Sequence, residues 1–324
     1  MRLKGAWDVE QRGFGQTGLQ VSALGFGAGQ VGDEKVSEHD AERLLNAVLD
    51  EGITLIDTAR GYGLSEERIG KYISHRRNEF VLSTKVGYGI TGYEDWTYDC
   101  ILAGVDEALR LLKTDYIDIV HLHSCPVETL RKGDVIRALE DVKQAGKIRV
   151  AAYSGDNEHL NFAIESGRFG SVETSINMCD QRVISDGLAK AAQKGLGVIA
   201  KRPIANAPWR FEERPVGHYC ELYWERLREM GLDPGMFAGR AATVVRDTGD
   251  TSSSNGSASV AWNELALRFT AYQPGVHSCI VGTTSVDHLR QNIRVLEHGP
   301  LDPDTVAQIR SRFEAHDRDW VGLT

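Results

Sequence analysis

Eight short runs of apolar and β-branched residues recur along the chain, and one segment with helical periodicity separates most of them. Short apolar runs bounded by turn residues favour strands over helices. Eight strands alternating with helices predict a parallel sheet that closes into a (β/α)8 TIM barrel, and 324 residues suit that α/β fold. The runs cover residues 23–26, 53–56, 80–84, 117–122, 149–153, 172–176, 197–200 and 278–281.

The helical segments are predicted from apolar faces and from capping residues. Residues 37–40 form a capping box at the start of a helix over 41–50. Ile101 and Val105 fall on one face of a helix that follows Trp96. We also expect an N-terminal β-hairpin over 11–22 and a C-terminal extra helix over Pro303–His316. Further helices are expected over residues 134–145, 157–166, 182–194, 259–272 and 285–296.

One connection is longer than the others. We expect a single barrel domain over residues 1–324, with a long loop at about 204–258 between the seventh strand and the seventh helix. Its later part, residues 247–257, is rich in Ser, Gly and Asp and has little to bury. Loops of this length are usually functional or disordered. We therefore hypothesise that this loop covers the mouth of the barrel.

Composition narrows the class of partner. The chain has 37 Lys and Arg against 46 Asp and Glu, a net charge of -9, which disfavours nucleic acid. No apolar run approaches the roughly 18 to 20 residues that span a bilayer, and the N-terminus lacks the form of a signal peptide. The 5 cysteines are scattered and contain no CxxC pair, which suits reduced thiols. These features predict a cytoplasmic protein that acts on a small molecule, without a nucleic-acid or membrane partner; they indicate no oligomeric state.

Four side chains with acid/base chemistry follow three successive predicted strands. Asp57 and Tyr62 come after the second strand, Lys85 ends the third and His123 ends the fourth. The carboxyl ends of barrel strands converge on one mouth. A free tyrosine, with a pKa of about 10, is a poor proton donor near neutral pH. A neighbouring ammonium would lower that pKa, and a carboxylate would keep the ammonium charged. With a histidine to bind a substrate carbonyl, this set predicts the interconversion of carbonyl compounds and alcohols.

Each of these residues also has a structural interpretation. Asp57 could cap the helix that begins near Ser65, Lys85 could be a solvated strand end, and His123 could be an internally bonded core histidine. Their common position at successive strand ends favours the joint, functional interpretation.

Several motifs resemble, in order, those of the aldo-keto reductase family. They lie at residues 18–27, 56–63, 65–70, 83–85, 115–123 and 282–292. The resemblance implies a barrel that binds a nicotinamide cofactor, usually NADPH, across its C-terminal mouth. It implies that Tyr62 is the general acid, that Lys85 paired with Asp57 tunes it, and that His123 orients the substrate oxygen. Hydride would then pass directly, without a metal.

The cofactor positions implied by the resemblance match the family less well. Ser154 would hold the carboxamide, but Glu173 stands where the family has a glutamine. Arg202 could face a phosphate. Near the 2′-phosphate end, Gly282 and His288 replace a basic pair, with Arg290 nearby, and the N–H groups of residues 282–285 form a plausible anion site. NADP(H) is favoured over NAD(H). The expected cofactor residues are Gly27, Ala28, Ser154, Glu173, Lys201, Arg202, Pro203, Gly282, Thr284, His288, Gln291 and Asn292.

The substrate itself cannot be identified from the sequence, but its surroundings can be suggested. Gln30, Val31, Tyr88 and Trp96 lie on loops at the expected mouth, and we expect them to line the substrate pocket. The reaction could also run in reverse, as in an aldose 1-dehydrogenase, with the same four catalytic residues. A non-catalytic, nicotinamide-sensing auxiliary subunit of an ion channel is a further alternative that the resemblance leaves open.

Two other interpretations come from short motifs. Residues 27–32 match G-x-G-x-x-G, the dinucleotide fingerprint of a doubly wound fold, with Asp57 as the acidic residue further on. His121 and His123 lie on one face of a predicted strand, as in the HxH pair of metal-dependent hydrolase barrels, and Cys125 could add a ligand. The eight repeats disfavour the first motif. Metal-dependent hydrolase barrels carry the HxH pair on the first strand, whereas here the pair is expected on the fourth. This position disfavours a metal site, so no metal is expected.

Overall fold

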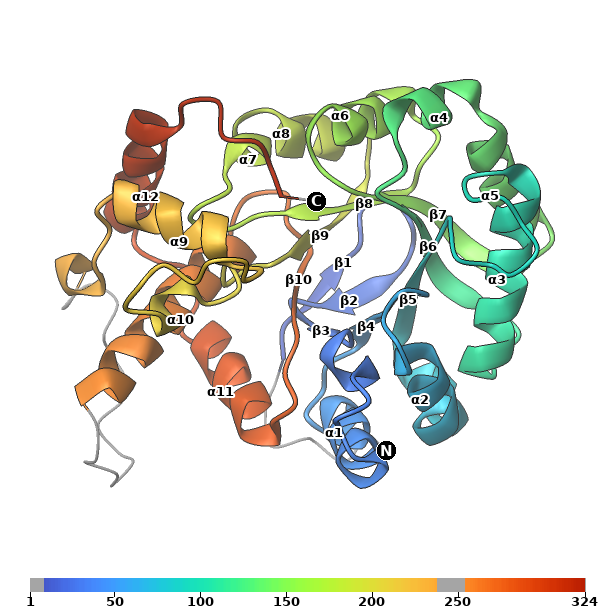
Figure 1. Ribbon diagram of the computed structural model, residues 1–324, viewed down its shortest axis with the longest axis horizontal. Helices are drawn as coiled ribbons and strands as arrows, with labels where there is room; N and C mark the ends of the chain where they lie inside the picture. The colour runs from blue at the N-terminus through green and yellow to red at the C-terminus, as the bar shows by residue number, and fades with distance from the viewer. Residues whose placement is uncertain (1–8, 238–253, 324) are drawn as a thin grey trace.

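A closed barrel of eight parallel strands forms the centre of the computed structural model, which describes residues 9–237 and 254–323 (Figure 1). The order around the barrel is β10-β3-β4-β5-β6-β7-β8-β9, and every neighbouring pair is parallel. The (β/α)8 fold is therefore confirmed, and the doubly wound alternative is excluded. The strands are β3 (Leu24–Gly27), β4 (Leu55–Asp57), β5 (Val81–Val86), β6 (Ile117–His123), β7 (Ile148–Ser154), β8 (Ser171–Ser175), β9 (Gly197–Lys201) and β10 (Ser278–Val281).

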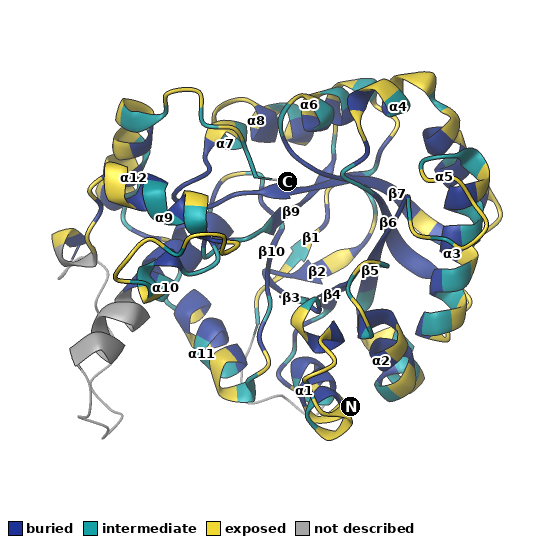
Figure 2. Ribbon diagram, in the orientation of Figure 1, coloured by how far each residue is buried: buried dark blue, intermediate teal, exposed yellow. Residues whose placement is uncertain are grey.

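Helices surround the barrel and bury their apolar faces against it, so their outer faces are the exposed ones in Figure 2. The predicted cap of the first helix is confirmed, because the Ser37 side chain accepts a hydrogen bond from the Asp40 N–H. No helix in the described part of the chain has the length and apolar character needed to cross a bilayer. The surrounding helices are α1 (Glu38–Asp50), α2 (Ser65–Tyr72), α3 (Tyr98–Leu112), α4 (Val127–Lys132), α5 (Asp134–Gln144), α6 (Asn157–Ser166), α7 (Arg182–Ser185), α8 (Gly187–Gln193), α10 (Ser254–Ala271) and α11 (Val286–Glu297).

The predicted helix over 182–194 is in fact two helices. α7 ends at Ser185 and α8 begins at Gly187, because Asp186 between them has φ -136° and ψ -44°, outside the helical range.

The connection predicted as a loop over 204–258 contains helices. The 3-10 segments η3 (Pro208–Arg210) and η4 (Pro234–Phe237) flank α9 (Glu221–Glu229), and α10 begins at Ser254. The physical reason is that Tyr223 and Leu227, one turn apart on α9, pack into an apolar cluster with Phe313. The suggested covering role of residues 247–257 concerns a stretch that lies largely outside the described residues, which resume at 254.

Two further elements complete the molecule, both as predicted. The hairpin of β1 (Gln11–Gly13) and β2 (Gln20–Ser22) is antiparallel, and Phe14 and Val21 pack with Leu55 and Ile199 inside the N-terminal end of the barrel. The C-terminal helix α12 (Pro303–His316) begins after Asp302, whose side chain accepts a hydrogen bond from the Thr305 N–H. The hairpin therefore closes one end of the barrel and leaves the other end for chemistry.

Candidate active site

Polar side chains replace apolar ones on the inward face of the barrel as the strands approach their carboxyl ends. In register, Asp57 pairs with Ser83, and Lys85 pairs with His121. His123 pairs with Ser154, which in turn pairs with Glu173. Because side chains of a strand alternate between its faces, positions two residues apart, such as Ser83 and Lys85, point to the same side. The strands thus gather these groups in one layer beneath the mouth.

The Lys85 ammonium is the centre of this layer. It is 1% exposed and contacts the Asp57 carboxylate, the Thr58 carbonyl at 3.0 Å and Glu173 Oε1 at 3.4 Å. Ser83 donates to the other oxygen of Asp57 at 2.7 Å. Burial acts to lower the pKa of Lys85, but the charges of Asp57 and Glu173 outweigh burial and raise it. The lysine is therefore fixed in its charged form.

Two buried carboxylates share this single ammonium. Burial and the charge of Glu173 raise the pKa of Asp57 to about 7, against the opposing effect of Lys85. Burial also disfavours the ionised form of Glu173, but nearby cations, chiefly Lys85, hold its pKa near 2. When both acids are ionised, the group of Asp57, Lys85 and Glu173 carries one negative charge in excess.

Tyr62 and His123 face this layer from the mouth. The Lys85 Nζ lies 5.2 Å from the centroid of the Tyr62 ring, and the rings of Tyr62 and His123 meet edge to face with centroids 6.0 Å apart. The four predicted catalytic side chains are thus brought together. The Lys85 charge lowers the pKa of Tyr62 as expected, but burial and the charges of Asp57 and Glu173 raise it to about 12. The expected net lowering of the Tyr62 pKa is therefore wrong.

Both histidines of β6 are held neutral. Burial and the Lys85 charge lower the pKa of His123 to about 3, and burial lowers that of His121 to about 4. The Tyr88 hydroxyl lies 2.8 Å from His123 Nδ1, and the two rings stack with centroids 5.6 Å apart. When the phenol donates to Nδ1, the His123 proton resides on Nε2, which is then a hydrogen-bond donor.

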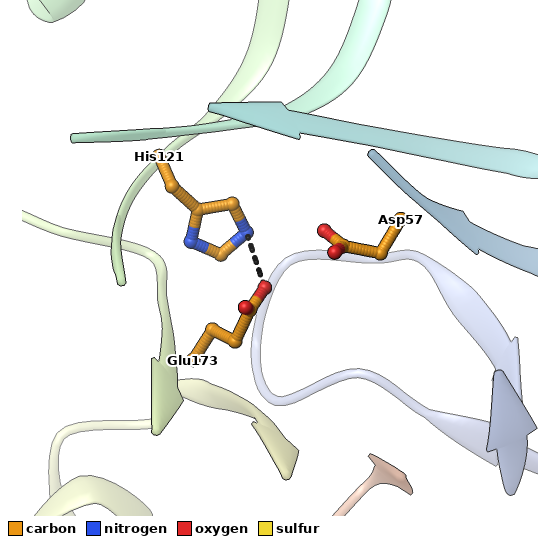
Figure 3. A group of neighbouring side chains, drawn as sticks. All are labelled: Asp57, His121 and Glu173. Carbon is orange, nitrogen blue, oxygen red and sulfur yellow. Dashed lines mark ion pairs between the residues drawn. The ribbon is translucent and has the colours of Figure 1, made fainter. Parts of the chain in front are cut away.

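Asp57, His121 and Glu173 approach one another closely enough to resemble a metal site (Figure 3). Their candidate ligand atoms lie within 4.8 Å of one another. However, the Lys85 ammonium already contacts both carboxylates and supplies the positive charge that a metal would bring. His123, the second histidine of the HxH pair, is instead bonded to Tyr88. The cluster is therefore better suited to acid/base chemistry than to a metal centre.

A cleft of about 1030 Å³ extends from Tyr62 and His123 to the start of α11. Ser285 caps that helix by accepting a hydrogen bond from the His288 N–H. Of the residues expected to bind cofactor or substrate, those that line the cleft are Gly27, Gln30, Ser154, Glu173, Lys201, Arg202, Pro203, Gly282, Thr284, His288, Gln291 and Asn292.

Four expected lining residues lie elsewhere. Ala28 and Val31 are buried in the core. Tyr88 supports His123, and Trp96 packs edge-on behind Tyr88 with ring centroids 5.8 Å apart. Only Gln30 of the predicted substrate residues lines the cleft.

Three cationic side chains at or near the cleft, Arg202, Lys201 and Arg290, are already engaged. Arg202 donates to Ser175 Oγ at 3.0 Å, to the Leu323 carbonyl and to the Tyr219 hydroxyl. Lys201 pairs with Asp156 at 2.9 Å. Arg290 pairs with Glu51 at 2.7 Å and does not line the cleft.

Several residues that shape the site were not predicted. Ser83 could have been found, because it precedes Lys85 by two positions on the same strand face. Trp209, Arg210 and Tyr219 line the cleft from the connection that was expected to lack structure. No local pattern marks these three residues as neighbours of the strand ends.

The glycines of the G-x-G-x-x-G motif have a different role from that of a dinucleotide fingerprint. They lead from β3 into the 3-10 turn η1 (Gln30–Gly32), which lies against Tyr62. A Cβ atom at Gly32 would lie 1.7 Å from the Tyr62 carbonyl oxygen. The motif therefore permits a close backbone approach that fixes the loop of Tyr62.

Comparison with known proteins agrees with this geometry. The profile described as "Aldo/keto reductase family" matches residues 23–313. L-galactose dehydrogenase of Arabidopsis thaliana is 28% identical over 323 residues, which cover 94% of this chain and 95% of the relative. A probable voltage-gated potassium channel subunit beta of Oryza sativa is 25% identical over 325 residues, covering 94% of this chain and 96% of the relative. The holo form of an aldo-keto reductase from Bacillus halodurans superposes with a TM-score of 0.73 at 27% identity, covering 94% and 96% of the two chains. With its barrel, the cluster around Lys85 and a profile match across most of its length, the chain belongs to the aldo/keto reductase family.

Proposed function

We propose that the protein is a nicotinamide-dependent oxidoreductase that interconverts aldehydes or ketones and alcohols. The observation that carries this proposal is the meeting of Tyr62, Asp57 and His123 at the lining of one cleft, with the Lys85 ammonium buried beneath them. Family membership supports an oxidoreductase that uses a nicotinamide cofactor. No nucleic-acid or membrane partner is needed for this reaction.

The residues that line the cleft fit such a cofactor. Glu173 Oε2 is buried and has no hydrogen-bond partner among the described residues, so it can accept from an amide N–H group such as that of a carboxamide. Ser154 stands beside it, with its hydroxyl 3.3 Å from Glu173 Oε1. Gly282 and the N–H groups at the start of α11 offer donors for phosphate oxygens at the far end. Once bound, the nicotinamide supplies hydride to a carbonyl carbon or accepts it from an alcohol carbon.

The protein's own groups would manage the proton and the oxygen. Tyr62 is protonated at neutral pH and can donate its proton to the oxygen of a carbonyl under reduction. Its raised pKa, about 12, makes it a weaker acid than a free tyrosine, so the Lys85 charge, which acts to lower that pKa, is needed for the transfer. The Lys85 ammonium, held by Asp57, stabilises the phenolate that remains. His123, neutral and with Nδ1 bonded to Tyr88, offers Nε2–H to the same oxygen.

We also propose that NADP(H) is favoured over NAD(H). Support comes from His288, which lines the cleft, and from the N-terminal N–H groups of α11. Arg290 is held by Glu51 and is not part of this support. The preference should therefore be modest.

The first test is Tyr62→Phe, which removes the phenolic proton and keeps the ring. We expect turnover of a simple aldehyde to fall by at least about 100-fold, the usual scale of general acid catalysis. Binding of cofactor should stay within a few fold of wild type, measured by fluorescence titration with NADPH and NADH. The same titrations measure the preference for NADP(H). Comparable turnover in the variant would refute the assignment of Tyr62.

The direction of the reaction has a second candidate. Similarity to an L-galactose dehydrogenase favours oxidation of a sugar, with the phenolate form of Tyr62 as proton acceptor. Similarity to potassium channel subunits favours a non-catalytic, cofactor-sensing role. A panel of aldehydes, ketones and sugars with both cofactors separates these: turnover of any of them supports an enzyme, and cofactor binding without turnover supports a sensor.

A further inference from the structure

The layer beneath the mouth contains more negative than positive charge. Among the described residues, Lys85 is the one cation that forms an ion pair with Asp57 or Glu173. His121 also approaches Glu173, but it is neutral. The nearby Lys201 is paired with Asp156 at 2.9 Å, and Arg202 is bonded to Leu323 and Tyr219. When Asp57 and Glu173 are both ionised, one carboxylate charge is therefore left without a matching cation; because the pKa of Asp57 is raised to about 7, this condition is met above neutral pH.

That excess charge is located mainly on Glu173. Asp57 is satisfied by Lys85 and by Ser83, which donates at 2.7 Å. Glu173 lies farther from the ammonium, at 3.4 Å, and its Oε2 has no hydrogen-bond partner in the described part of the chain. His121 Nε2 lies 3.8 Å from that oxygen. The Glu173 side chain is 2% exposed, so water screens the charge weakly.

This charge lies where the reacting ring must bind, if the proposed function is correct. Glu173 lines the cleft together with Tyr62, His123 and Ser154. A ring whose carbon reacts next to Tyr62 and His123 must lie over these strand ends. The oxidised nicotinamide ring carries a positive charge, whereas the reduced ring is neutral. A fixed carboxylate therefore attracts the oxidised form of the cofactor and not the reduced form.

We propose that Glu173 sets the preference of this site for the oxidised form of the nicotinamide cofactor. A glutamine at this position could make similar hydrogen bonds but would lack the charge. The inference rests on the proposed function and deepens it, because a resting enzyme that holds the oxidised form is ready to accept hydride from an alcohol. It involves no chemical step beyond that reaction.

The test compares dissociation constants of the oxidised and the reduced cofactor, measured by calorimetry in the absence of substrate. In Glu173→Gln the ratio of the oxidised to the reduced dissociation constant should rise by at least roughly tenfold, because one unit charge a few ångströms from the ring has about that effect even when it is screened almost as in water, and a larger effect when it is partly buried. Because a ratio is measured on one sample, partial misfolding changes the number of sites but not the expected shift.

Two variants serve as controls. Glu173→Asp keeps the charge and should keep the ratio closer to wild type than Glu173→Gln does. Glu42→Gln removes the same charge from the exposed face of α1 and should leave the ratio unchanged.

The outcomes are distinct. A raised ratio confined to Glu173→Gln supports the inference. If both forms bind to wild type and Glu173→Gln leaves their ratio within twofold, or lowers it, the inference is overturned while the proposed function stands. If wild type binds neither form, the proposed function fails and the inference fails with it.

Discussion

Burial determines the protonation state of the histidines beneath the mouth. His121 is fully buried, its Nε2 lies 3.1 Å from Ser83 Oγ, and its Nδ1 has no partner among the described residues. Charging this ring would place a second cation beside Lys85 without a new hydrogen bond. Its pKa is accordingly lowered from 6.5 to about 4.

This shift predicts acid sensitivity. Because the folded-state pKa of His121 lies below its unfolded value, the unfolded chain binds more protons. The contribution to stability is present above pH 6.5 and is lost as pH falls toward 4. Between pH 7.5 and 5, we expect His121 alone to cost about 2 kcal/mol of the free energy of unfolding.

Urea unfolding of wild type and His121→Gln at both pH values measures that loss. The variant should lose about 2 kcal/mol less than wild type over this interval. His39→Gln, at an exposed position on α1, should behave like wild type. Parallel losses in wild type and His121→Gln would show that His121 does not resist protonation.

At the scale of the element, the turn η1 supports Tyr62 through its backbone. Arg68 on α2 donates to the carbonyls of Val31 at 2.6 Å and Asp33 at 2.8 Å, which ties the turn to the helix that follows Tyr62. Gly32 then meets the Tyr62 backbone with no room for a side chain. The position of the phenol is thus set by two neighbouring βα connections.

Gly32→Ala tests this support. The new Cβ would lie 1.7 Å from the Tyr62 carbonyl oxygen, so the turn or the Tyr62 loop must move. We expect a loss of about 1–3 kcal/mol in stability. A displacement of about 1 Å at the proton donor can cost up to about 100-fold in turnover.

Gly29→Ala is the matched control. Gly29 has helical φ and ψ of -56° and -45°, and a Cβ there would meet the Tyr62 ring at 3.6 Å, an ordinary contact. Stability and turnover should therefore remain close to wild type. If the two alanine variants have the same turnover, the backbone contact at Gly32 does not position Tyr62.

At the scale of the whole molecule, the sequence predicts the repeated strands and helices and the elements that are marked by local signals. β10 and α12 have the predicted bounds, because a short apolar run and an N-terminal cap are local signals. β4 begins two residues later than the predicted strand at 53. The Thr54 N–H instead donates to the Ser22 hydroxyl, and the Ser22 N–H donates to the Thr54 hydroxyl, both at 2.9 Å. These hydrogen bonds are tertiary contacts with the hairpin.

Long-range contacts explain what the sequence could not predict at the site. Arg202 is held by Tyr219 and Leu323, and neither lies in a motif near it. The link between Glu173 and Lys85 joins β8 to β5 across the barrel, and only the closed sheet brings them together. The raised pKa of Tyr62 likewise follows from burial and two carboxylates, whereas the prediction from the sequence rested only on the effect of Lys85 on that pKa and gave Asp57 the role of keeping the lysine charged.

The two ends of the barrel have different roles. The hairpin fills the N-terminal end: Phe14 is fully buried, and its ring lies so close to Gly197 that a Cβ there would meet it at 2.5 Å. The acid/base cluster occupies the opposite, C-terminal end, as in other barrels of this type. Changes at Phe14 should therefore affect stability without affecting chemistry.

Phe14→Ala should lower the free energy of unfolding by about 3–5 kcal/mol, because it removes a buried ring and leaves a cavity. Phe14→Leu, which fills most of that space, should cost less than about 1.5 kcal/mol. Well below the unfolding midpoint, both variants should keep wild-type turnover and cofactor affinity. Urea unfolding and steady-state kinetics on the same samples measure both effects. Reduced turnover in fully folded Phe14→Ala would mean that packing at the closed end reaches Tyr62 and its neighbours through the strands, and that the two ends are not independent.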